Sequence, residues 1–280
     1  MKDTILYGDC RKTLCAFLPQ SARVCVTSPP YYGLRDYGGE ESQIGLEQTP
    51  EEFIDELVKV FREVRNVLTD DGTCWVNIGD SYYNYRPGRG QGLAKQTVSN
   101  NKQDLPDVCP RRGNKLEGFK EKDLIGIPWM FAFAMRADGW YLRQDIIWNK
   151  PNPMPESVRD RCTKSHEYIF LFSKSQNYYF DVDAIKEDTR RKRSVWNVTK
   201  KPYKGAHFAV FPPELIEPCI LAGSEKSDTI LDPFMGSGTT AMVSKKLNRH
   251  YIGCELHENY GNLIEERVSS YENKLEKFFK

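Results

Sequence analysis

Short apolar runs alternate along the chain with longer stretches whose apolar residues recur at helical spacing. The apolar runs predict strands at residues 4–7, 24–27, 73–78, 141–148, 167–173, 229–231 and 250–255. Helical spacing predicts helices at residues 50–68, 128–137, 212–221, 239–247 and from 259 to the C-terminus. Strands that alternate with helices are typical of an α/β protein with a doubly wound, mostly parallel sheet.

Three segments depart from this alternation. Asp70, Asp71 and Gly72 predict a turn before the strand at 73–78. Residues 178–180 are expected to return as an antiparallel hairpin strand beside 167–173, after a turn near 175–177. Residues of about 84–122 show no sustained period and are rich in Gly, Asn, Gln and basic residues, which indicates an insertion in the sheet domain.

The composition is that of an ordinary folded chain. With 280 residues, of which 39% are hydrophobic and 28% charged, the chain can bury a core, and we expect a single domain over residues 1–280. No apolar run approaches the roughly 20 residues that span a bilayer. The first residues lack the apolar core of a signal peptide. We therefore expect a cytoplasmic protein with no membrane partner.

The formal net charge is only +1, but charge is uneven along the chain. Basic residues gather in the insertion at about 84–122 and in a short linker at about 186–206. Local basic clusters on a near-neutral protein suit a polyanion that binds one face, although solvated loops with scattered lysines are an alternative for each cluster.

The eight cysteines form no C-x-x-C pair, and no histidine lies at zinc spacing from them. Several lie within apolar strand patterns. We expect reduced, mostly buried thiols and no metal.

The strand at 24–27 ends in an unusual segment, Ser28-Pro29-Pro30-Tyr31. Neither proline has a backbone N–H, and both have a nearly fixed φ. The carbonyl oxygens of this corner are therefore held in one geometry, in which they can accept hydrogen bonds from an amino group. Tyr31 supplies a flat ring beside them. These parts can hold a planar ring that bears an amino group.

A glycine turn follows the strand at 229–231. Gly236 and Gly238 permit a ligand to approach the backbone closely, and the next helix begins with free N–H groups that point into the turn. The following strand ends at Glu255, whose carboxylate can accept hydrogen bonds from ribose hydroxyls. Asp232 would repel a pyrophosphate but tolerate an ammonium or sulfonium group. The unit predicts a nucleoside site and favours S-adenosyl-L-methionine over a dinucleotide.

With both sites in view, the chain resembles the permuted β class of DNA amino-methyltransferases, which act on cytosine N4 or adenine N6. Residues 232–240 match the methyl-donor loop of that family, and residues 27–31 match its catalytic motif, in the order typical of this class. The resemblance implies a Rossmann-like, circularly permuted S-adenosyl-L-methionine-dependent fold. It assigns catalysis to Ser28, Pro29, Pro30 and Tyr31. It assigns cofactor binding to Asp9, Cys10, His207, Phe211, Asp232, Pro233, Phe234, Gly236, Ser237, Gly238, Thr239, Thr240 and Glu255.

The same resemblance implies double-stranded DNA as the substrate, with the target base flipped out of the duplex. The linker is too short for a separate recognition domain, so the insertion is the larger candidate for reading the DNA sequence. A homodimer and a companion restriction endonuclease are left open, and the protein would be bacterial, archaeal or phage-encoded. The expected DNA contacts are Tyr32, Lys150, Asn152, His166, Arg86, Arg89, Arg111 and Arg112.

Ser28 favours cytosine N4 as the methylated atom. Adenine enzymes of the family more often carry Asp or Asn at this position, and a neutral hydroxyl beside the amine is the usual N4 arrangement. Adenine N6 is the alternative. Cytosine C5 methylation would need a cysteine nucleophile, and the dipeptide Pro218-Cys219 lies in an apolar helical stretch, so we interpret Cys219 as part of the core.

Three other classes of protein would account for fewer of these sequence motifs. An NAD-dependent oxidoreductase would use the glycine turn but leave the Ser28–Tyr31 corner unexplained. An inactive DNA-binding module would leave two intact chemical motifs unused. An RNA or protein-glutamine methyltransferase could use a similar proline–tyrosine corner, and the basic segments favour nucleic acid over protein.

Overall fold

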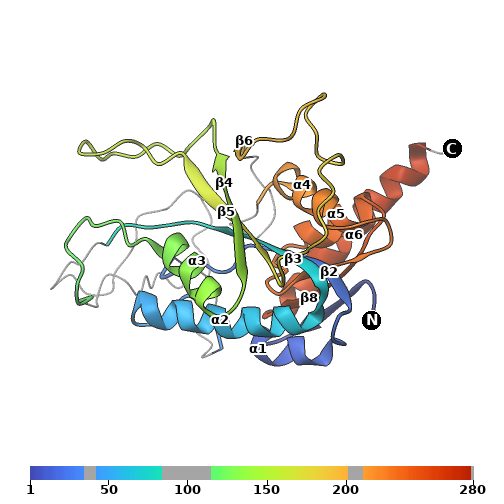
Figure 1. Cartoon of the computed structure of the whole chain (residues 1–280), viewed down its shortest axis with the longest axis horizontal. Helices are drawn as coiled ribbons and strands as arrows, with labels where there is room; N and C mark the ends of the chain where they lie inside the picture. Colours follow the sequence, from blue (N-terminus) through green and yellow to red (C-terminus); the bar gives the residue numbers. More distant parts are fainter. Residues whose placement is uncertain (35–41, 84–114, 201–210, 279–280) are drawn as a thin grey trace.

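The computed structural model is built on one sheet of eight strands, with helices packed on both faces (Figure 1). It describes residues 1–34, 42–83, 115–200 and 211–278, with side chains up to residue 269. The strand order is β1-β8-β7-β2-β3-β5-β4-β6. The strands are β1 (Thr4–Tyr7), β2 (Ala22–Thr27), β3 (Leu68–Ile78), β4 (Tyr141–Asn149), β5 (His166–Ser173), β6 (Val195–Asn197), β7 (Thr229–Asp232) and β8 (His250–Glu255).

Two groups of helices cover the sheet. One face packs against α1 (Cys10–Thr13), α2 (Pro50–Val67) and α3 (Ile127–Ala137). On the other side lie α4 (Pro213–Gly223), α5 (Thr239–Lys246) and α6 (Gly261–Phe278), as Figure 1 shows. Short 3-10 turns at Leu14–Ala16 and Glu258–Tyr260 complete the helical segments. The five helices expected from the sequence are confirmed within two residues at each end.

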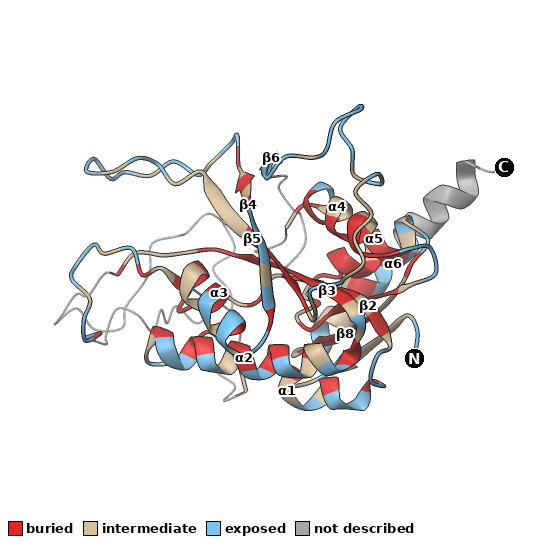
Figure 2. Ribbon diagram, viewed as in Figure 1, coloured by how far each residue is buried: buried red, intermediate tan, exposed pale blue. Residues whose placement is uncertain are grey.

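Side chains of the central strands point alternately to the two faces of the sheet, which divides the core into two layers. In β2, Cys25 packs with α2 and α3, whereas Val24 and Val26 pack with α4. Successive side chains of a strand point to opposite faces, so one apolar run supplies both layers. Figure 2 shows the buried residues concentrated in the centre of the sheet and on the adjoining parts of α2, α4 and α5. Each fully buried large apolar side chain contributes roughly 1.5–3 kcal/mol.

The sheet is parallel from β1 through β3, and the antiparallel exception is β5. Strand β5 runs antiparallel to both β3 and β4, while β6 pairs parallel to β4. Strands β2 and β7 are neighbours, with Cys25 opposite Leu231. Two segments about 200 residues apart in sequence therefore end at the same edge of the sheet.

The expected turn at Asp70–Gly72 is wrong, because these residues belong to the continuous strand β3. The register against β2 shifts between Ala22 and Val24, which accommodates the polar residues within the strand. Arg23 forms an ion pair with Asp71 across this irregularity. A Cβ at Gly72 would come within 3.0 Å of the carbonyl oxygen of Arg23, so glycine permits the close approach of the two strands.

The expected hairpin strand at 178–180 is also wrong, because these described residues form no strand. The antiparallel strand is β5 itself. Phe180 instead stacks on Trp75 with ring centroids 6.1 Å apart, and Tyr179 N donates to the carbonyl of Asp71. The aromatic residues that suggested a strand are used to cover one face of the sheet. The short strand β6 was not expected from the sequence.

Most of the insertion at 84–122 and part of the linker at 186–206 lie outside the described residues. Within the described part of the chain, no helix has the length and apolar character needed to cross a membrane. The prediction of free, mostly buried thiols is confirmed for the described cysteines. Five are buried and two exposed: Cys10, Cys25, Cys74, Cys219 and Cys254, and Cys15 and Cys162.

Candidate active site

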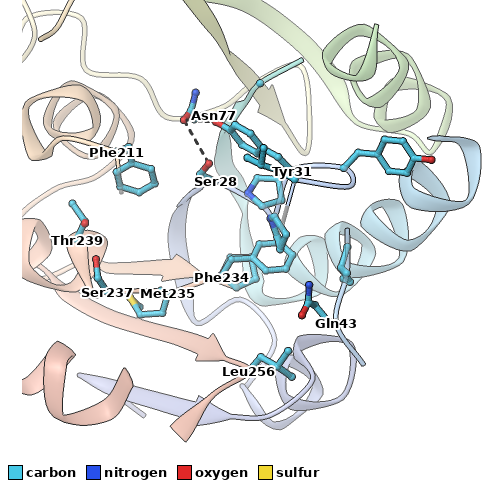
Figure 3. A pocket seen from close by; sticks show the side chains of 18 of the residues that line it. Ser28, Tyr31, Gln43, Asn77, Phe211, Phe234, Met235, Ser237, Thr239 and Leu256 are labelled. Carbon is cyan, nitrogen blue, oxygen red and sulfur yellow. Dashed lines mark hydrogen bonds between the residues drawn. The ribbon is translucent and has the colours of Figure 1, made fainter. Parts of the chain in front are cut away.

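A cavity of about 770 Å³ lies at the carboxyl ends of five parallel strands (Figure 3). Its wall includes Gly8 after β1, Ser28 after β2, Gly79 after β3, Pro233 after β7 and Glu255 at the end of β8. The carboxyl edge of an open α/β sheet is the usual place for a ligand, because loops from several strands converge there. The fold thus brings the proline corner and the glycine turn into one cavity.

All four residues expected at the catalytic corner line this cavity. In Figure 3, Ser28 and Tyr31 lie between Asn77 on one side and Phe234 on the other. Ser28 Oγ lies 3.5 Å from Asn77 Oδ1. The hydroxyl can donate its proton to this neutral amide oxygen, which leaves its own lone pairs available to accept hydrogen bonds from a ligand.

The ring of Tyr31 is packed against a glycine. A Cβ at Gly79 would come within 2.6 Å of Tyr31 Cε2 and within 3.2 Å of Cδ2. Any side chain at this position would therefore displace the ring. The pair Gly79-Asp80 follows β3 directly, and Asp80 accepts hydrogen bonds from the backbone N–H groups of Gly126 and Ile127 at the start of α3. The end of β3 is thereby tied to α3.

A polar network connects the corner to β5. Tyr31 Oη donates to Glu167 Oε2 at 2.8 Å, and Asn77 Nδ2 lies 3.4 Å from the same oxygen. The other carboxylate oxygen of Glu167 forms an ion pair with Lys150. Burial opposes ionisation of Glu167, but Lys150 and the Tyr31 hydroxyl outweigh it, so the pKa of this carboxyl lies below its usual value.

Lys150 is 6% exposed and is not among the residues that line the cavity. Its ammonium is 4.3 Å from the centroid of the Trp148 ring, a distance typical of a cation–π contact. Burial lowers the pKa of Lys150 to about 8, although the carboxylate of Glu167 opposes this decrease. Lys150 pairs with Glu167, and its expected role as a DNA contact stays a prediction.

The glycine turn is fixed by a buried carboxylate. Asp232 is 1% exposed and accepts hydrogen bonds from Thr27 Oγ1 and Thr240 Oγ1, both at 2.6 Å, and from Phe234 N at 3.0 Å. Burial raises the pKa of Asp232 to about 6. Asp232 does not line the cavity, and its expected contact with the cofactor stays a prediction. Its carboxylate joins β2, the turn and α5. Gly238 and Thr240 likewise lie outside the lining.

Glu255 lies in the cavity wall where the sequence places a ribose-binding carboxylate. Its oxygens accept hydrogen bonds from Gly236 N at 2.7 Å and from His257 N at 3.1 Å. Burial raises the pKa of Glu255 to about 7, and the nearby charge of Asp232 acts in the same direction. Glu255 therefore fixes the glycine turn and offers its remaining lone pairs to a ligand.

We predict that binding of S-adenosylhomocysteine weakens by about 10-fold between pH 8 and pH 6, because protonation of a group with a pKa near 7 removes the accepting carboxylate. The ligand binds the ionised form of Glu255. Affinity is therefore greatest well above pH 7 and decreases as the pH falls through 7. Isothermal calorimetry at several pH values measures this. In Glu255→Gln, affinity should be lower and nearly independent of pH; an unchanged slope in that variant would contradict the assignment to Glu255.

The remaining expected cofactor residues mostly line the cavity. These are Asp9, Cys10, Phe211, Pro233, Phe234, Gly236, Ser237 and Thr239. Asp9 is the N-cap of α1. Burial opposes ionisation of its carboxyl, but the paired Arg11 outweighs burial and holds the pKa of Asp9 below its usual value. Arg11 also pairs with Glu56 on α2. His207 lies outside the described residues.

The expected DNA contacts are less uniform. Tyr32 borders the cavity but is 3% exposed, with its ring on Phe53 and its hydroxyl bound to Gln48 O, so it belongs mainly to the core. Asn152 lines the cavity. Its side-chain amide donates to the backbone carbonyl of Lys200 and accepts from the backbone N–H of Lys200. His166 packs edge-on against Tyr168 and is not part of the lining. Arg86, Arg89, Arg111 and Arg112 lie outside the described residues.

Sequence reasoning missed Asn77 and Asp80 as residues of the cavity wall, whereas the family resemblance places the segment His166-Glu167 at the target-base pocket. Asn77 is a polar residue within the apolar run of β3, and Asp80 follows that strand directly. A buried polar side chain near a strand end was the available signal. Glu167 begins an apolar run in the same way, but its orientation depends on β5 running antiparallel.

A family model described as DNA methylase, for N6 and N4 methyltransferases, matches residues 22–266. The chain is 48% identical over 277 residues to the type II methyltransferase M.Cfr9I of Citrobacter freundii, covering 97% of this chain and 89% of that relative. It is 49% identical over 271 residues to the type II methyltransferase M.SmaI of Serratia marcescens, covering 94% and 90%.

Solved structures resemble the fold over nearly its whole length. The PvuII DNA methyltransferase, described as cytosine-N4-specific, has a TM-score of 0.70 at 18% identity and covers 98% of this chain and 92% of its own. A putative DNA modification methylase of Thermus thermophilus, complexed with S-adenosyl-L-methionine, has a TM-score of 0.65 at 25% identity and covers 96% and 93%.

Proposed function

Since the chain belongs to the N6/N4 family of DNA methylases, we propose that it methylates the exocyclic N4 of a cytosine flipped out of double-stranded DNA. DNA methylation and S-adenosyl-L-methionine as the methyl donor follow from the family. The single observation that carries the proposal is the meeting of the Ser28–Tyr31 corner and the donor loop in one cavity.

The cavity fits the methyl donor. Glu255 would supply carboxylate oxygens for the ribose, and Asp9, the N-cap of α1 on the neighbouring strand's loop, lines the same part of the sheet edge. Phe211 and Phe234 add apolar surface to the wall, and the Gly236 turn leaves room for close approach. When bound there, the donor would supply its methyl group to the exocyclic amine held at the Ser28 corner, leaving S-adenosylhomocysteine, and the methylated amine would lose one proton to solvent.

The corner prepares the amine. The lone pair of an exocyclic amine is delocalised into the base, which makes the nitrogen a poor nucleophile. The hydroxyl or carbonyl of Ser28 and the carbonyl of Pro29 accept hydrogen bonds from the two N–H groups, so the nitrogen can become pyramidal and its lone pair is freed. Tyr31 stacks on the flipped base. Placement and electrostatic preorganisation supply most of the acceleration.

Cytosine is favoured by the neutral hydrogen-bond partner of Ser28. Ser28 contacts the amide of Asn77, and no carboxylate hydrogen-bonds to Ser28 among the described residues. A neutral hydroxyl beside the amine is the arrangement expected for N4 methylation. The fold also resembles a methyltransferase described as cytosine-N4-specific, although that likeness concerns the fold. Adenine N6 is the second candidate, because the same carbonyl acceptors and ring suit its amine.

Mass spectrometry of nucleosides tests the choice of base. Plasmid DNA treated with the protein and S-adenosyl-L-methionine should yield N4-methyldeoxycytidine after digestion. N6-methyldeoxyadenosine alone would reverse the choice of base. No methylated nucleoside at all would overturn the proposed function.

We also propose that the protein is a type II modification enzyme of the cytoplasm, encoded by a bacterium, an archaeon or a phage. The relatives that carry the type II name support this, and a companion endonuclease is part of the proposal. Residues 84–122 are the proposed sequence-reading region within a single domain over 1–280. Its arginines would contact phosphates or guanine edges.

A further inference from the structure

Glu167 occupies an unusual position for a carboxylate. It lies near the start of β5, the strand that runs antiparallel to its neighbours, and its side chain reaches the wall of the cavity. Its two oxygens receive three donors: the hydroxyl of Tyr31, the amide of Asn77 and the ammonium of Lys150. A carboxylate in a confined site is stable only when it is paired in this way.

Lys150, the cationic partner of Glu167, is itself held in place by neighbouring groups. Lys150 follows β4, and its backbone N–H donates to Ser165 O at 2.7 Å, which joins the two ends of the β4–β5 connection. Its ammonium lies over Trp148 and pairs with Glu167. Lys200 also faces this pair and lines the cavity. Lys150 therefore fixes one oxygen of Glu167 and leaves the other directed at Tyr31.

The ring of Tyr31 is constrained from two sides. The bare Cα of Gly79 packs against one edge of the ring, where a Cβ would not fit. The hydroxyl is held by Glu167 Oε2 at 2.8 Å. Because a phenolic O–H lies in the plane of its ring, a short hydrogen bond to a fixed carboxylate restricts both the direction of the side chain and the tilt of the ring. Base stacking depends on that tilt.

We infer that Glu167, anchored by Lys150, is a positioning residue that orients the ring of Tyr31 for stacking on the flipped base. The inference rests on the proposed function, because it needs a base in the cavity. Glu167 acts through the Tyr31 hydroxyl and leaves the cofactor half of the cavity unaffected. A purely structural ion pair would not require the phenol.

A double-mutant cycle between Glu167→Gln and Tyr31→Phe isolates this connection. The amide of Gln cannot serve both sides: if its oxygen faces Lys150, its NH₂ group faces the Tyr31 hydroxyl. We expect Glu167→Gln to lower kcat for DNA methylation by about 10-fold or more, as for loss of a hydrogen bond to a charged group. In the Tyr31→Phe background, the same change should cost less than about 2-fold.

Two further measurements separate positioning from folding. The affinity for S-adenosylhomocysteine, measured by calorimetry, should be the same in Glu167→Gln as in the wild-type protein. Glu217→Gln, which removes a surface carboxylate paired with Lys246, serves as the matched control and should leave kcat unchanged. If Glu167→Gln fails to fold, Glu167→Asp gives the same cycle, because its shorter carboxylate keeps the charge but draws back from Tyr31.

Equal losses of kcat in both backgrounds would overturn the inference, since Glu167 would then act independently of Tyr31. A loss of S-adenosylhomocysteine affinity in Glu167→Gln would also overturn it. These outcomes differ from failure of the proposed function, in which the wild-type protein itself methylates no base. If that protein methylates adenine, the cycle is measured on adenine, and the inference stands or falls by the same comparison.

Discussion

Replacing Tyr31 with Ala should lower kcat/KM for DNA methylation by about 100-fold, because stacking of a base on an aromatic ring is worth about 1–3 kcal/mol. The ring lies at the end of β2 beside Ser28 and forms part of the cavity wall. Ala keeps the backbone carbonyls of the corner but removes the surface on which the flipped base rests. Tyr31→Phe keeps that surface and should retain more activity than Tyr31→Ala.

Steady-state kinetics with tritiated S-adenosyl-L-methionine and duplex DNA measures the loss in Tyr31→Ala. Cys219→Ala is the control for chemistry. Cys219 is 1% exposed within α4, its thiol contacts Leu215 O at 3.8 Å, and burial raises its pKa above the usual value. The interpretation of Cys219 as core is confirmed, and its variant should stay active. Loss of activity in folded Cys219→Ala would contradict the amino-methylation mechanism.

The second large effect is expected at Asp232, whose replacement by Ala should lower the free energy of unfolding by about 3 kcal/mol or more. The change leaves two hydroxyls, from Thr27 and Thr240, and the N–H of Phe234 without their buried acceptor. Because Asp232 joins β2 to the donor loop, cofactor affinity should fall together with stability. Urea unfolding without ligand measures the first effect, and calorimetry with S-adenosylhomocysteine measures the second.

Asp228→Ala is the matched control for this prediction. Asp228 lies one residue before β7, accepts from Glu225 N and pairs with Arg23 at 3.4 Å in a partly exposed position. Its removal should cost about 1 kcal/mol or less. If Asp232→Ala instead keeps its stability and loses only cofactor affinity, the carboxylate contacts the cofactor directly and its structural role is wrong.

Local sequence patterns were sufficient for the parts of the site that lie on the backbone. Ser28, Pro29 and Pro30 define a rigid corner wherever they occur, because the proline rings fix φ and remove two donors. Gly236 and Gly238 define a turn for a similar reason, and both have positive φ in the structure. These features depend on covalent geometry, so they are readable before any tertiary contact is known.

Side-chain partners were harder to predict. Asp232 is a carboxylate beside a nucleoside loop, and charge alone suggested that it faces the ligand. The parallel pairing of β2 with β7 instead places Thr27 within 2.6 Å of it, and the carboxylate is buried. The antiparallel pairing of β4 with β5 likewise turns Lys150, an expected DNA contact, towards Glu167. In each case, the partner lies on a strand distant in sequence.

The sequence by itself determined the α/β architecture, the two chemical motifs and their order, because periodicity, proline and glycine act locally. Only the tertiary structure decided that β5 runs antiparallel, that Asp232 binds protein groups rather than lining the cavity, and that Glu167, Asn77 and Gly79 surround Tyr31. The physical reason is that a side chain's hydrogen-bond partner depends on strand direction and register, which are fixed by packing across the whole sheet.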